Sequence, residues 1–154
     1  MQGIDIRMVA SDGEGADLAR LLWRVLWEPL GLPEGMVRSF GLVTPRTDLI
    51  AVRCDAVVGG LVANWLSDAE VEIRHLAVLP EYQRQSVGRR LACALIRLAD
   101  HERAASIETY ARNTSADFFA RLGFLPTGEH LEDAHFGKYG IHFERMRLEL
   151  AGSI

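Results

Sequence analysis

The sequence predicts a mixed α/β domain, in which flanking helices cover a central, mostly antiparallel sheet of about six or seven strands. Several short segments alternate apolar and polar residues, whereas longer segments repeat apolar residues with a helical period. Three of the strand segments follow one another with tight joins, which is typical of an antiparallel meander. A long helical segment then separates two strand segments, which is typical of a strand–helix–strand crossover between parallel strands.

Composition bounds the class of protein. The chain has 154 residues, 49% of them hydrophobic and 25% charged, which predicts one compact domain over residues 1–154 and excludes a disordered chain. The net charge of −4 argues against a nucleic-acid binder. Two cysteines are too few for a disulfide framework or a four-thiolate zinc site. No stretch approaches the ~20 apolar residues of a membrane span, and no signal peptide is recognisable, so we expect a cytoplasmic protein.

The first third of the chain predicts one strand and one helix. Residues 4–9 alternate apolar and polar side chains, and residues 11–15 form a polar break. Apolar residues from Leu18 to Leu26 then share one helical face, which ends before Pro29. Trp23 and Trp27 widen this apolar surface, and we interpret them as core or interface residues, with a substrate groove as the alternative.

The meander follows. Residues 47–53 and 56–65 predict two strands joined by a turn at residues 54–55, and residues 70–78 predict the third strand. Gly59 and Gly60 lie inside the second strand and predict a β-bulge.

The second half of the chain alternates helices and strands. The apolar pattern predicts a helix over 87–102, a strand over 106–111 and a helix over 115–122. A segment over 124–131, a polar loop and a final strand over 141–150 complete the order.

The turn between the third strand of the meander and the long helix is the most informative stretch. Pro80 ends the strand, and a polar segment leads straight into the helix, whose first N–H groups carry partial positive charge. Arg84, Arg89 and Arg90 add full charges nearby. This arrangement suits a phosphate or pyrophosphate. The alternative is that the arginines are a solvated face and that Gly88 only lets the helix pack closely.

The two common nucleotide-binding glycine motifs, Gly-x-x-x-x-Gly-Lys-Ser/Thr and Gly-x-Gly-x-x-Gly, are absent. Residues 83–88 (Gln-Arg-Gln-Ser-Val-Gly) instead resemble the Arg/Gln-x-x-Gly-x-Gly/Ala turn of the GNAT superfamily of N-acetyltransferases. Ser86 stands where that family usually has its first glycine. A serine keeps the backbone donor, so pyrophosphate binding requires only that the local dihedral angles tolerate a side chain.

Two further segments carry the resemblance. Residues 113–124 are similar to the family signature Asn-x-x-Ala-x-x-Phe-Tyr-x-Lys-Leu-Gly-Phe, with Phe119 in the tyrosine position and Arg121 in the lysine position. Gly140-Ile141-His142 and Met146 resemble the last strand of one branch of the superfamily. The resemblance is close from residue 72 to residue 146, whereas the first 50 residues fit only in element order.

The resemblance implies an acetyl-CoA site in a V-shaped gap between two neighbouring parallel strands, those ending near Val78 and Ala111. The third meander strand would pair with the pantetheine arm, and the turn would hold the pyrophosphate. The implied cofactor-binding residues are Leu76, Ala77, Val78, Gln83, Arg84, Gln85, Ser86, Val87, Gly88, Arg89, Asn113, Phe118 and Phe119.

The implied chemistry is direct attack of an amine on the thioester, which needs a base. Glu72 is the family-like candidate, and His75 is the second because its ordinary pKa is near the working range. Strand alternation places these two side chains on opposite faces of the sheet. The general acid stays unassigned, because Phe119 lacks a hydroxyl and nothing selects Tyr110 or Tyr139.

The sequence leaves several alternatives open. His130, Glu132 and His135 are metal-ligating residue types, but their spacing matches no helical pattern and we expect a solvated loop without metal. The chain is alternatively a CoA-binding module without catalysis, or a serine hydrolase using Ser86, a near miss to Gly-x-Ser-x-Gly. The acceptor is expected to be a primary amine of a small molecule or peptide, and a homodimer is left open.

Overall fold

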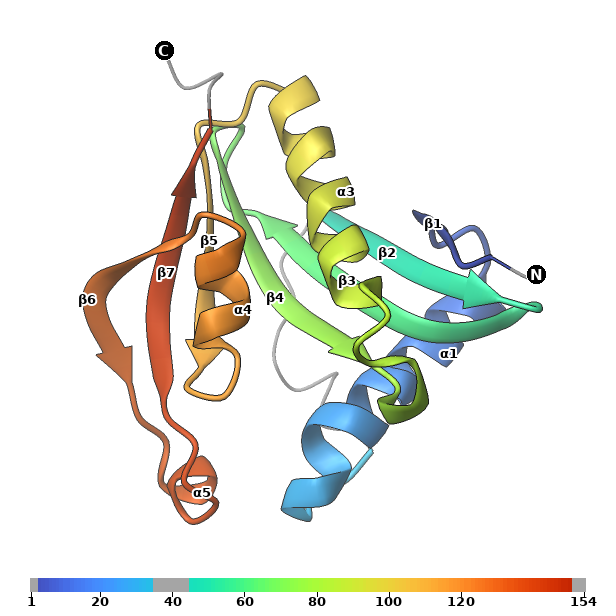
Figure 1. Cartoon of the computed structure of the whole chain (residues 1–154), viewed down its shortest axis with the longest axis horizontal. Helices are drawn as coiled ribbons and strands as arrows, with labels where there is room; N and C mark the ends of the chain where they lie inside the picture. The colour runs from blue at the N-terminus through green and yellow to red at the C-terminus, as the bar shows by residue number, and fades with distance from the viewer. Residues whose placement is uncertain (1–2, 35–44, 151–154) are drawn as a thin grey trace.

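The computed structural model describes residues 3–34 and 45–150 of the chain. Seven strands form one sheet in the order β1-β2-β3-β4-β5-β7-β6 (Figure 1). Strands β4 and β5 run parallel and the other paired strands run antiparallel, which confirms the predicted fold class. The strands are β1 (Asp5–Met8), β2 (Arg46–Arg53), β3 (Ala56–Trp65), β4 (Glu70–Val78), β5 (Ser106–Arg112), β6 (Leu125–Leu131) and β7 (Phe143–Glu149).

Helices cover both faces of the sheet. Helix α3 (Val87–His101) and α4 (Ala116–Arg121) pack on one face, and α1 (Asp12–Leu22) packs on the other (Figure 1). Helix α1 continues into a π-helical turn, η1 (Trp23–Trp27), and a 3-10 turn, η2 (Glu28–Leu30). Two short elements, η3 (Pro80–Tyr82) and α5 (Ala134–Gly137), complete the set. Within residues 3–34 and 45–150, no helix is long and apolar enough to cross a membrane.

The structure corrects the start of the first helix. Residues 11–15 are not a break, because α1 begins at Asp12 and Ser11 is its N-cap. The Oγ of Ser11 accepts a hydrogen bond from the Glu14 N–H at 3.1 Å, and the Glu14 carboxylate accepts one from the Ala10 N–H at 2.8 Å. This reciprocal capping outweighs the low helix propensity of two glycines in the first turn. A similar cap explains α5 in the expected polar loop, where Asp133 accepts from two backbone N–H groups.

Gly59 and Gly60 allow both helical layers to approach β3. A Cβ on Gly59 would lie 3.1 Å from Cγ1 of Val87 in α3, and one on Gly60 would lie 2.1 Å from Cδ1 of Leu18 in α1. The β-bulge expected at this pair falls one residue earlier, because the register with β2 skips Val58. The glycines therefore serve close packing on opposite faces rather than the bulge itself.

A second bulge changes the faces of β4. The register with β3 skips Arg74, so the expectation of strict alternation along this strand is wrong. Ile73 packs into the cluster on the α3 side, whereas His75 contacts Trp27 on the α1 side. Glu72 is paired with Asn64 in the sheet, and both lie on the α1 side. The bulge therefore brings Glu72 and His75 to the same face, not to opposite faces.

Candidate active site

Strands β4 and β5 separate partway along their length. They pair with each other from Glu70 and Ser106 as far as Ile73 and Thr109. Beyond that point β4 continues to Val78 and β5 to Arg112 without pairing with each other. At the point of separation, Oγ1 of Thr109 donates a hydrogen bond to the Ile73 carbonyl at 3.0 Å. The expected V-shaped gap is confirmed, and it leaves the β5-facing edge of residues 74–78 without a strand partner.

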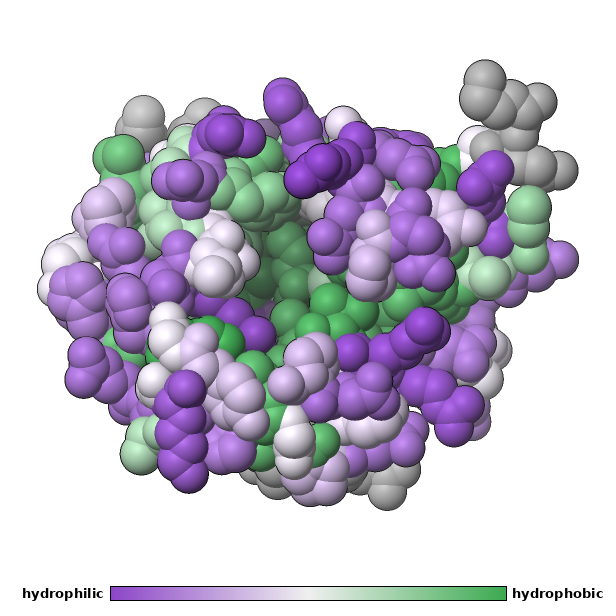
Figure 2. Space-filling view, turned by 60° about the horizontal axis from the view of Figure 1, so that its bottom comes forward, coloured by the Kyte–Doolittle hydropathy of each residue, from purple (hydrophilic) through white to green (hydrophobic). Residues whose placement is uncertain are grey.

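A cavity of about 680 Å³ fills the wide end of this gap, between the end of β4, the start of α3 and α4. Figure 2 views the molecule from this end and shows a hollow with an apolar floor and a hydrophilic rim. Most of the cofactor-binding residues predicted from the sequence line this cavity: Leu76, Ala77, Val78, Gln83, Arg84, Ser86, Val87, Gly88, Arg89, Phe118 and Phe119.

The start of α3 faces the cavity without a side-chain cap. Ser86, its N-cap, has left-handed backbone angles (φ 64°, ψ 16°) and makes no capping hydrogen bond, and no acidic residue lies in the first turn. Arg84 also has a positive φ of 67°. Left-handed residues alternating with others turn successive N–H groups toward one point, which forms an anion-binding concavity. Ser86 therefore adopts the conformation for which the family pattern has glycine.

Gly88 forms part of the cavity wall. A Cβ at this position would lie 3.5 Å from the Phe118 ring and 3.7 Å from Cγ2 of Val78, which are ordinary contact distances. An alanine would therefore fit the fold, whereas a larger side chain would have to extend into the cavity.

Two predicted residues do not reach the cavity. The Gln85 side chain donates to the Glu81 carbonyl at 3.2 Å. The Asn113 side chain donates to the Gly140 carbonyl and accepts from the His142 N–H, each at 3.1 Å, so it holds the loop before β7. In the family signature, the asparagine precedes the tyrosine by seven positions. Counted back from Phe119, this position is residue 112 rather than 113.

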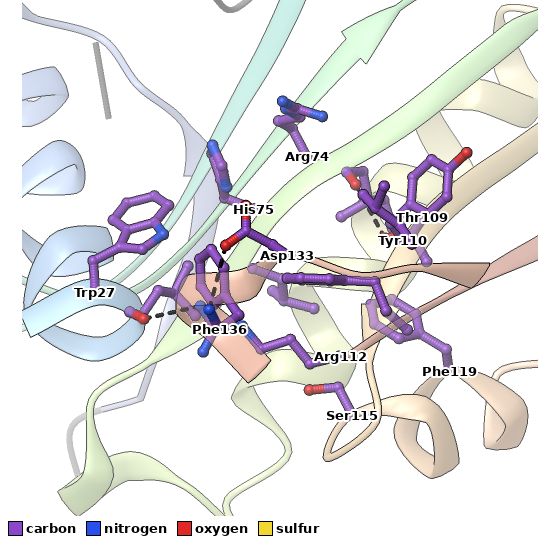
Figure 3. Close-up of a pocket in the computed structure, with 16 residues that line it drawn as sticks. Trp27, Arg74, His75, Thr109, Tyr110, Arg112, Ser115, Phe119, Asp133 and Phe136 are labelled. Atoms are coloured by element: carbon purple, nitrogen blue, oxygen red, sulfur yellow. Dashed lines mark hydrogen bonds between the residues drawn. The ribbon is translucent and has the colours of Figure 1, made fainter. Parts of the chain in front are cut away.

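Arg112 lines the candidate site, and the sequence analysis missed it. It lines the large cavity and also a smaller one of about 230 Å³ on the α1 side of the gap (Figure 3). Its guanidinium donates to the Leu26 carbonyl in η1 at 2.9 Å and lies 5.5 Å from the centre of the Phe136 ring. The correct count within the signature was the signal that could have found it. The residues shared by both cavities are Leu26, Leu76, Arg112, Ser115 and Phe119.

The smaller cavity has mainly aromatic and aliphatic walls. Trp27 of η1 and Phe136 of α5 line it, and Phe143 and Leu131 extend its apolar surface. Trp27 is buried, which agrees with its interpretation as a core residue, but it also forms part of this wall. The cavity suits a small ligand with an apolar part.

His75 is neutral in this setting. Its ring packs edge to face on Trp27, with ring centres 4.9 Å apart. Burial, reinforced by the charges of Arg74 and Arg112, lowers the pKa of His75 to about 3. The expectation of a pKa near the working range is therefore wrong, and the ring has little basicity at neutral pH.

The pKa of Glu72 is shifted in the opposite direction from that of His75. Burial raises the pKa of Glu72, and Glu108 on the adjacent strand also raises it, while Arg74 and a hydrogen bond from Asn64 act in the other direction. Glu72 lines neither cavity, but it lies on the same face as His75, next to the Arg74 bulge. A group of this kind is suited to take up a proton through a water molecule.

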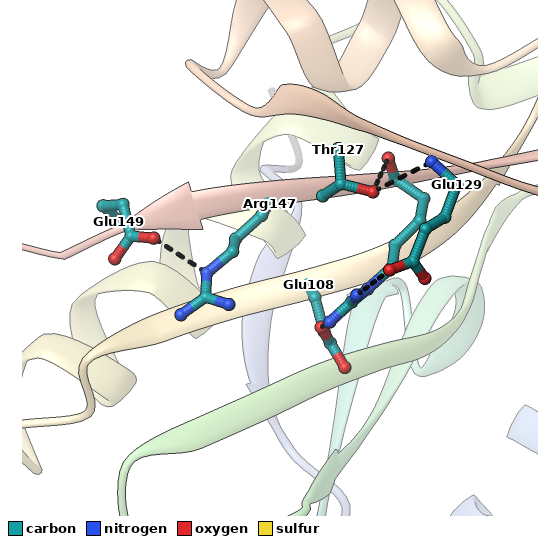
Figure 4. A network of polar contacts seen from close by, with 6 residues as sticks. Glu108, Thr127, Glu129, Arg147 and Glu149 are labelled. Atoms are coloured by element: carbon teal, nitrogen blue, oxygen red, sulfur yellow. Dashed lines mark hydrogen bonds and ion pairs between the residues drawn. The ribbon is translucent and has the colours of Figure 1, made fainter.

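Glu108, the neighbour of Glu72 in the sheet, is held by a polar network (Figure 4). Arg145 of β7 binds Glu108 through Nε at 3.0 Å and binds Glu129 of β6 at 3.0 Å. This network compensates the charge of Glu108 and ties β6 to β7 where their register shifts. Glu72, whose pKa is raised by burial, is the carboxyl group suited to accept a proton.

Two alternatives from the sequence, a hydrolase site at Ser86 and a metal site, find no support in the described part of the chain. None of the described residues lining the large cavity is a histidine or a carboxylate, so no base lies beside Ser86 for hydrolase chemistry. Residues 3–34 and 45–150 contain no group of three or more His, Cys, Asp or Glu side chains that could hold a metal ion. His135 is one of the three residues that were considered as metal ligands. Its Nε2 lies 2.9 Å from the Leu30 carbonyl oxygen.

Comparison with known proteins gives concordant results. The model of the acetyltransferase (GNAT) family matches residues 16–124. The ribosomal-protein-S18-alanine N-acetyltransferase of Escherichia coli superposes with a TM-score of 0.79 at 19% identity, over 96% of this chain and 94% of that one. An aminoglycoside 6'-N-acetyltransferase complexed with coenzyme A gives a TM-score of 0.76 at 16% identity, over 94% and 96% of the two chains. A GNAT acetyltransferase of Elizabethkingia anophelis with acetyl-CoA bound gives 0.69 at 16% identity, over 96% and 98%. At these identities the likeness shows a shared fold.

Proposed function

Because the chain belongs to the GNAT family of acetyltransferases, we propose that it moves the acetyl group of acetyl-CoA to a primary amine of a small molecule or peptide. One observation carries the proposal: an uncapped, positively charged helix start opens into a cavity that continues into a second, mostly apolar one. The first cavity suits a long cofactor with a pyrophosphate, and the second suits an acceptor beside the reactive end of that cofactor.

The cofactor would lie along the gap. The N–H groups at the start of α3, with Arg84 and Arg89, would bind the pyrophosphate, because cations and aligned backbone dipoles favour the same anion. The unpaired edge of residues 76–78 would pair with the amides of the pantetheine arm, as an added strand does. Phe118 and Phe119 supply apolar contact along the same wall.

The reaction follows from placing the two substrates end to end. The amine nitrogen attacks the thioester carbon and forms a C–N bond, which places negative charge on the carbonyl oxygen. The C–S bond then breaks, and its electron pair leaves with sulfur. The proton of the amine goes to Glu72 through water, because neutral His75 holds a proton poorly. Holding the amine against the thioester supplies much of the acceleration.

Turnover of acetyl-CoA with a panel of amines, followed by release of the free thiol, tests the proposal. Acetyl-CoA should raise the melting temperature, and at least one amine should release thiol faster than the no-amine control. A raised melting temperature without turnover for any amine would support a CoA-binding module instead. If acetyl-CoA leaves the melting temperature unchanged, the proposed function is wrong.

A further inference from the structure

Arg112 lies at the junction of the two cavities. Among the described residues it is the one charged side chain that lines both of them. It starts at the end of β5 and crosses toward η1, where it reaches the Leu26 carbonyl past the Phe136 ring (Figure 3). The guanidinium therefore stands between the place for the cofactor and the place for the acceptor.

No carboxylate of the described residues forms an ion pair with Arg112. Its side chain is partly buried, and burial lowers the pKa of Arg112, but an arginine stays protonated at neutral pH. A partly desolvated cation without an anionic partner is unfavourable. The hydrogen bond to the Leu26 carbonyl occupies one of the five guanidinium N–H donors, and the guanidinium also lies 5.5 Å from the centre of the Phe136 ring. The positive charge at the junction is therefore suited to a ligand group that carries or develops negative charge.

The proposed reaction creates such an anion at this place. The thioester must lie where the cavities meet, since the amine of the acceptor has to reach it from the smaller cavity. Negative charge develops first on the thioester oxygen and then on the departing sulfur. Phe119, which also lines the junction, has no hydroxyl with which to protonate the sulfur.

We infer that Arg112 is a catalytic residue that stabilises the negative charge on the thioester oxygen and on the departing CoA thiolate. It does so as a fixed cation and keeps its proton throughout: the C–S electron pair leaves with sulfur, and the amine proton goes to the base. The inference rests on the proposed function. In it, Arg112 takes the place of a general acid, because it stabilises the thiolate without protonating it.

Other charged groups surround the junction at the two ends of the gap. On the acceptor side, the titratable or charged residues are Arg74, His75, Tyr110 and Asp133. On the cofactor side they are Tyr82, Arg84, Arg89 and Arg121. Asp133 is the carboxylate of this set, and it caps α5 by accepting from the N–H groups of His135 and Phe136.

The test measures the thiol pKa of bound CoA from its thiolate absorbance. In the unmodified protein the bound thiol should have a pKa below that of free CoA. R112Q should raise the pKa of the bound thiol by about one unit, R112K should retain most of the lowering, and R97Q, a charge change at an exposed position of α3, should leave it unaltered. R112Q should also lower kcat about 100-fold with little change in the KM for acetyl-CoA.

Binding of CoA and of desulfo-CoA distinguishes a failure of the proposed function from a failure of the inference about Arg112. If neither CoA nor desulfo-CoA binds, the proposed function fails. If both bind but the thiol pKa of CoA in the unmodified protein equals or exceeds that of free CoA, the inference about Arg112 is wrong and the proposed function stands. The inference is equally overturned if R112Q leaves the thiol pKa unchanged and raises only the KM of acceptors that carry a carboxylate, because Arg112 would then bind the acceptor.

Discussion

Helices α1 and α3 both have a serine at the N-cap and a glycine at their second residue, but the two starts differ in backbone angles, capping and charge. At α1, Ser11 has extended backbone angles and its Oγ accepts from the Glu14 N–H. Glu14 in turn accepts from the Ala10 N–H and forms an ion pair with Arg7. At α3, Ser86 has a left-handed backbone and caps nothing.

The difference separates a structural helix start from a binding one. The chain satisfies the first N–H groups of α1 with its own side chains and places two acidic residues in the first turn. It leaves those of α3 without a cap, surrounds them with arginines and opens them to a cavity. The N–H groups that a side-chain cap would satisfy at α3 can donate hydrogen bonds to a ligand instead. Substitutions at matched positions of the two starts can test this contrast.

The largest effect is expected at the second residue of each helix, Gly13 in α1 and Gly88 in α3. Gly88→Leu should weaken acetyl-CoA binding about 100-fold, or about 2.7 kcal/mol, because its side chain would extend from the Phe118 contact into the cavity. Gly13→Leu should leave the affinity unchanged, since a Cβ there meets only the Ser11 Oγ at 3.9 Å. Titration calorimetry measures both. Equal affinities for the two variants would remove the start of α3 from the cofactor site.

The serines should differ in stability rather than in binding. Ser11→Ala should lower the free energy of unfolding by about 1 kcal/mol, because the Glu14 N–H loses its acceptor. Ser86→Ala should change it by less than about 0.5 kcal/mol, because this side chain makes no capping bond. Urea unfolding of both variants without ligand measures the difference. A loss at Ser86 as large as that at Ser11 would show that α3 has a hidden cap.

The start of α1, but not that of α3, should make the free energy of unfolding depend on pH in the acid range. The hydrogen bond from Arg7, and a second from the Ala10 N–H, lower the pKa of Glu14 from 4.5 to about 2. A folded-state pKa below the unfolded value contributes stability that is complete above pH 4.5 and is lost as the pH falls toward 2. Glu14→Gln should therefore flatten the decline of unfolding free energy in that range. The start of α3, with no acidic residue in its first turn, should contribute no such slope. An unaltered slope in the variant would contradict the Glu14 assignment.

The sequence predicted the fold well because its periodicities are local. The three meander strands were expected over 47–53, 56–65 and 70–78, and the structure has them within one residue of those bounds. The long helix was expected over 87–102 and ends at His101. The turn motif lies within one short segment, and most of the residues predicted there line the large cavity. The extent of the domain, the cytoplasmic location and a homodimer stay predictions.

What the sequence missed depends on contacts between distant segments. The bulge at Arg74 arises from the register with β3, so alternation within β4 alone placed Glu72 and His75 on opposite faces. The pKa of His75 is lowered by burial beside Trp27, which is remote in sequence. Arg112 was missed for a different reason, since an offset of one residue in the signature assigned its place to Asn113.

The smallest effect is expected from the backbone of the α3 start itself. Ser86 has a φ of 64°, a region that disfavours any side chain with a Cβ, so Ser86→Gly should raise the free energy of unfolding by about 0.5 kcal/mol. The gain is small because glycine also increases the conformational entropy of the unfolded chain. Acetyl-CoA affinity should change less than about threefold, or about 0.7 kcal/mol, because the N–H groups keep their directions. Urea unfolding and calorimetry on one preparation measure both quantities. A large loss of affinity with unchanged stability would instead assign the Ser86 hydroxyl to the ligand, and the binding start would then depend on a side chain, as the structural start does.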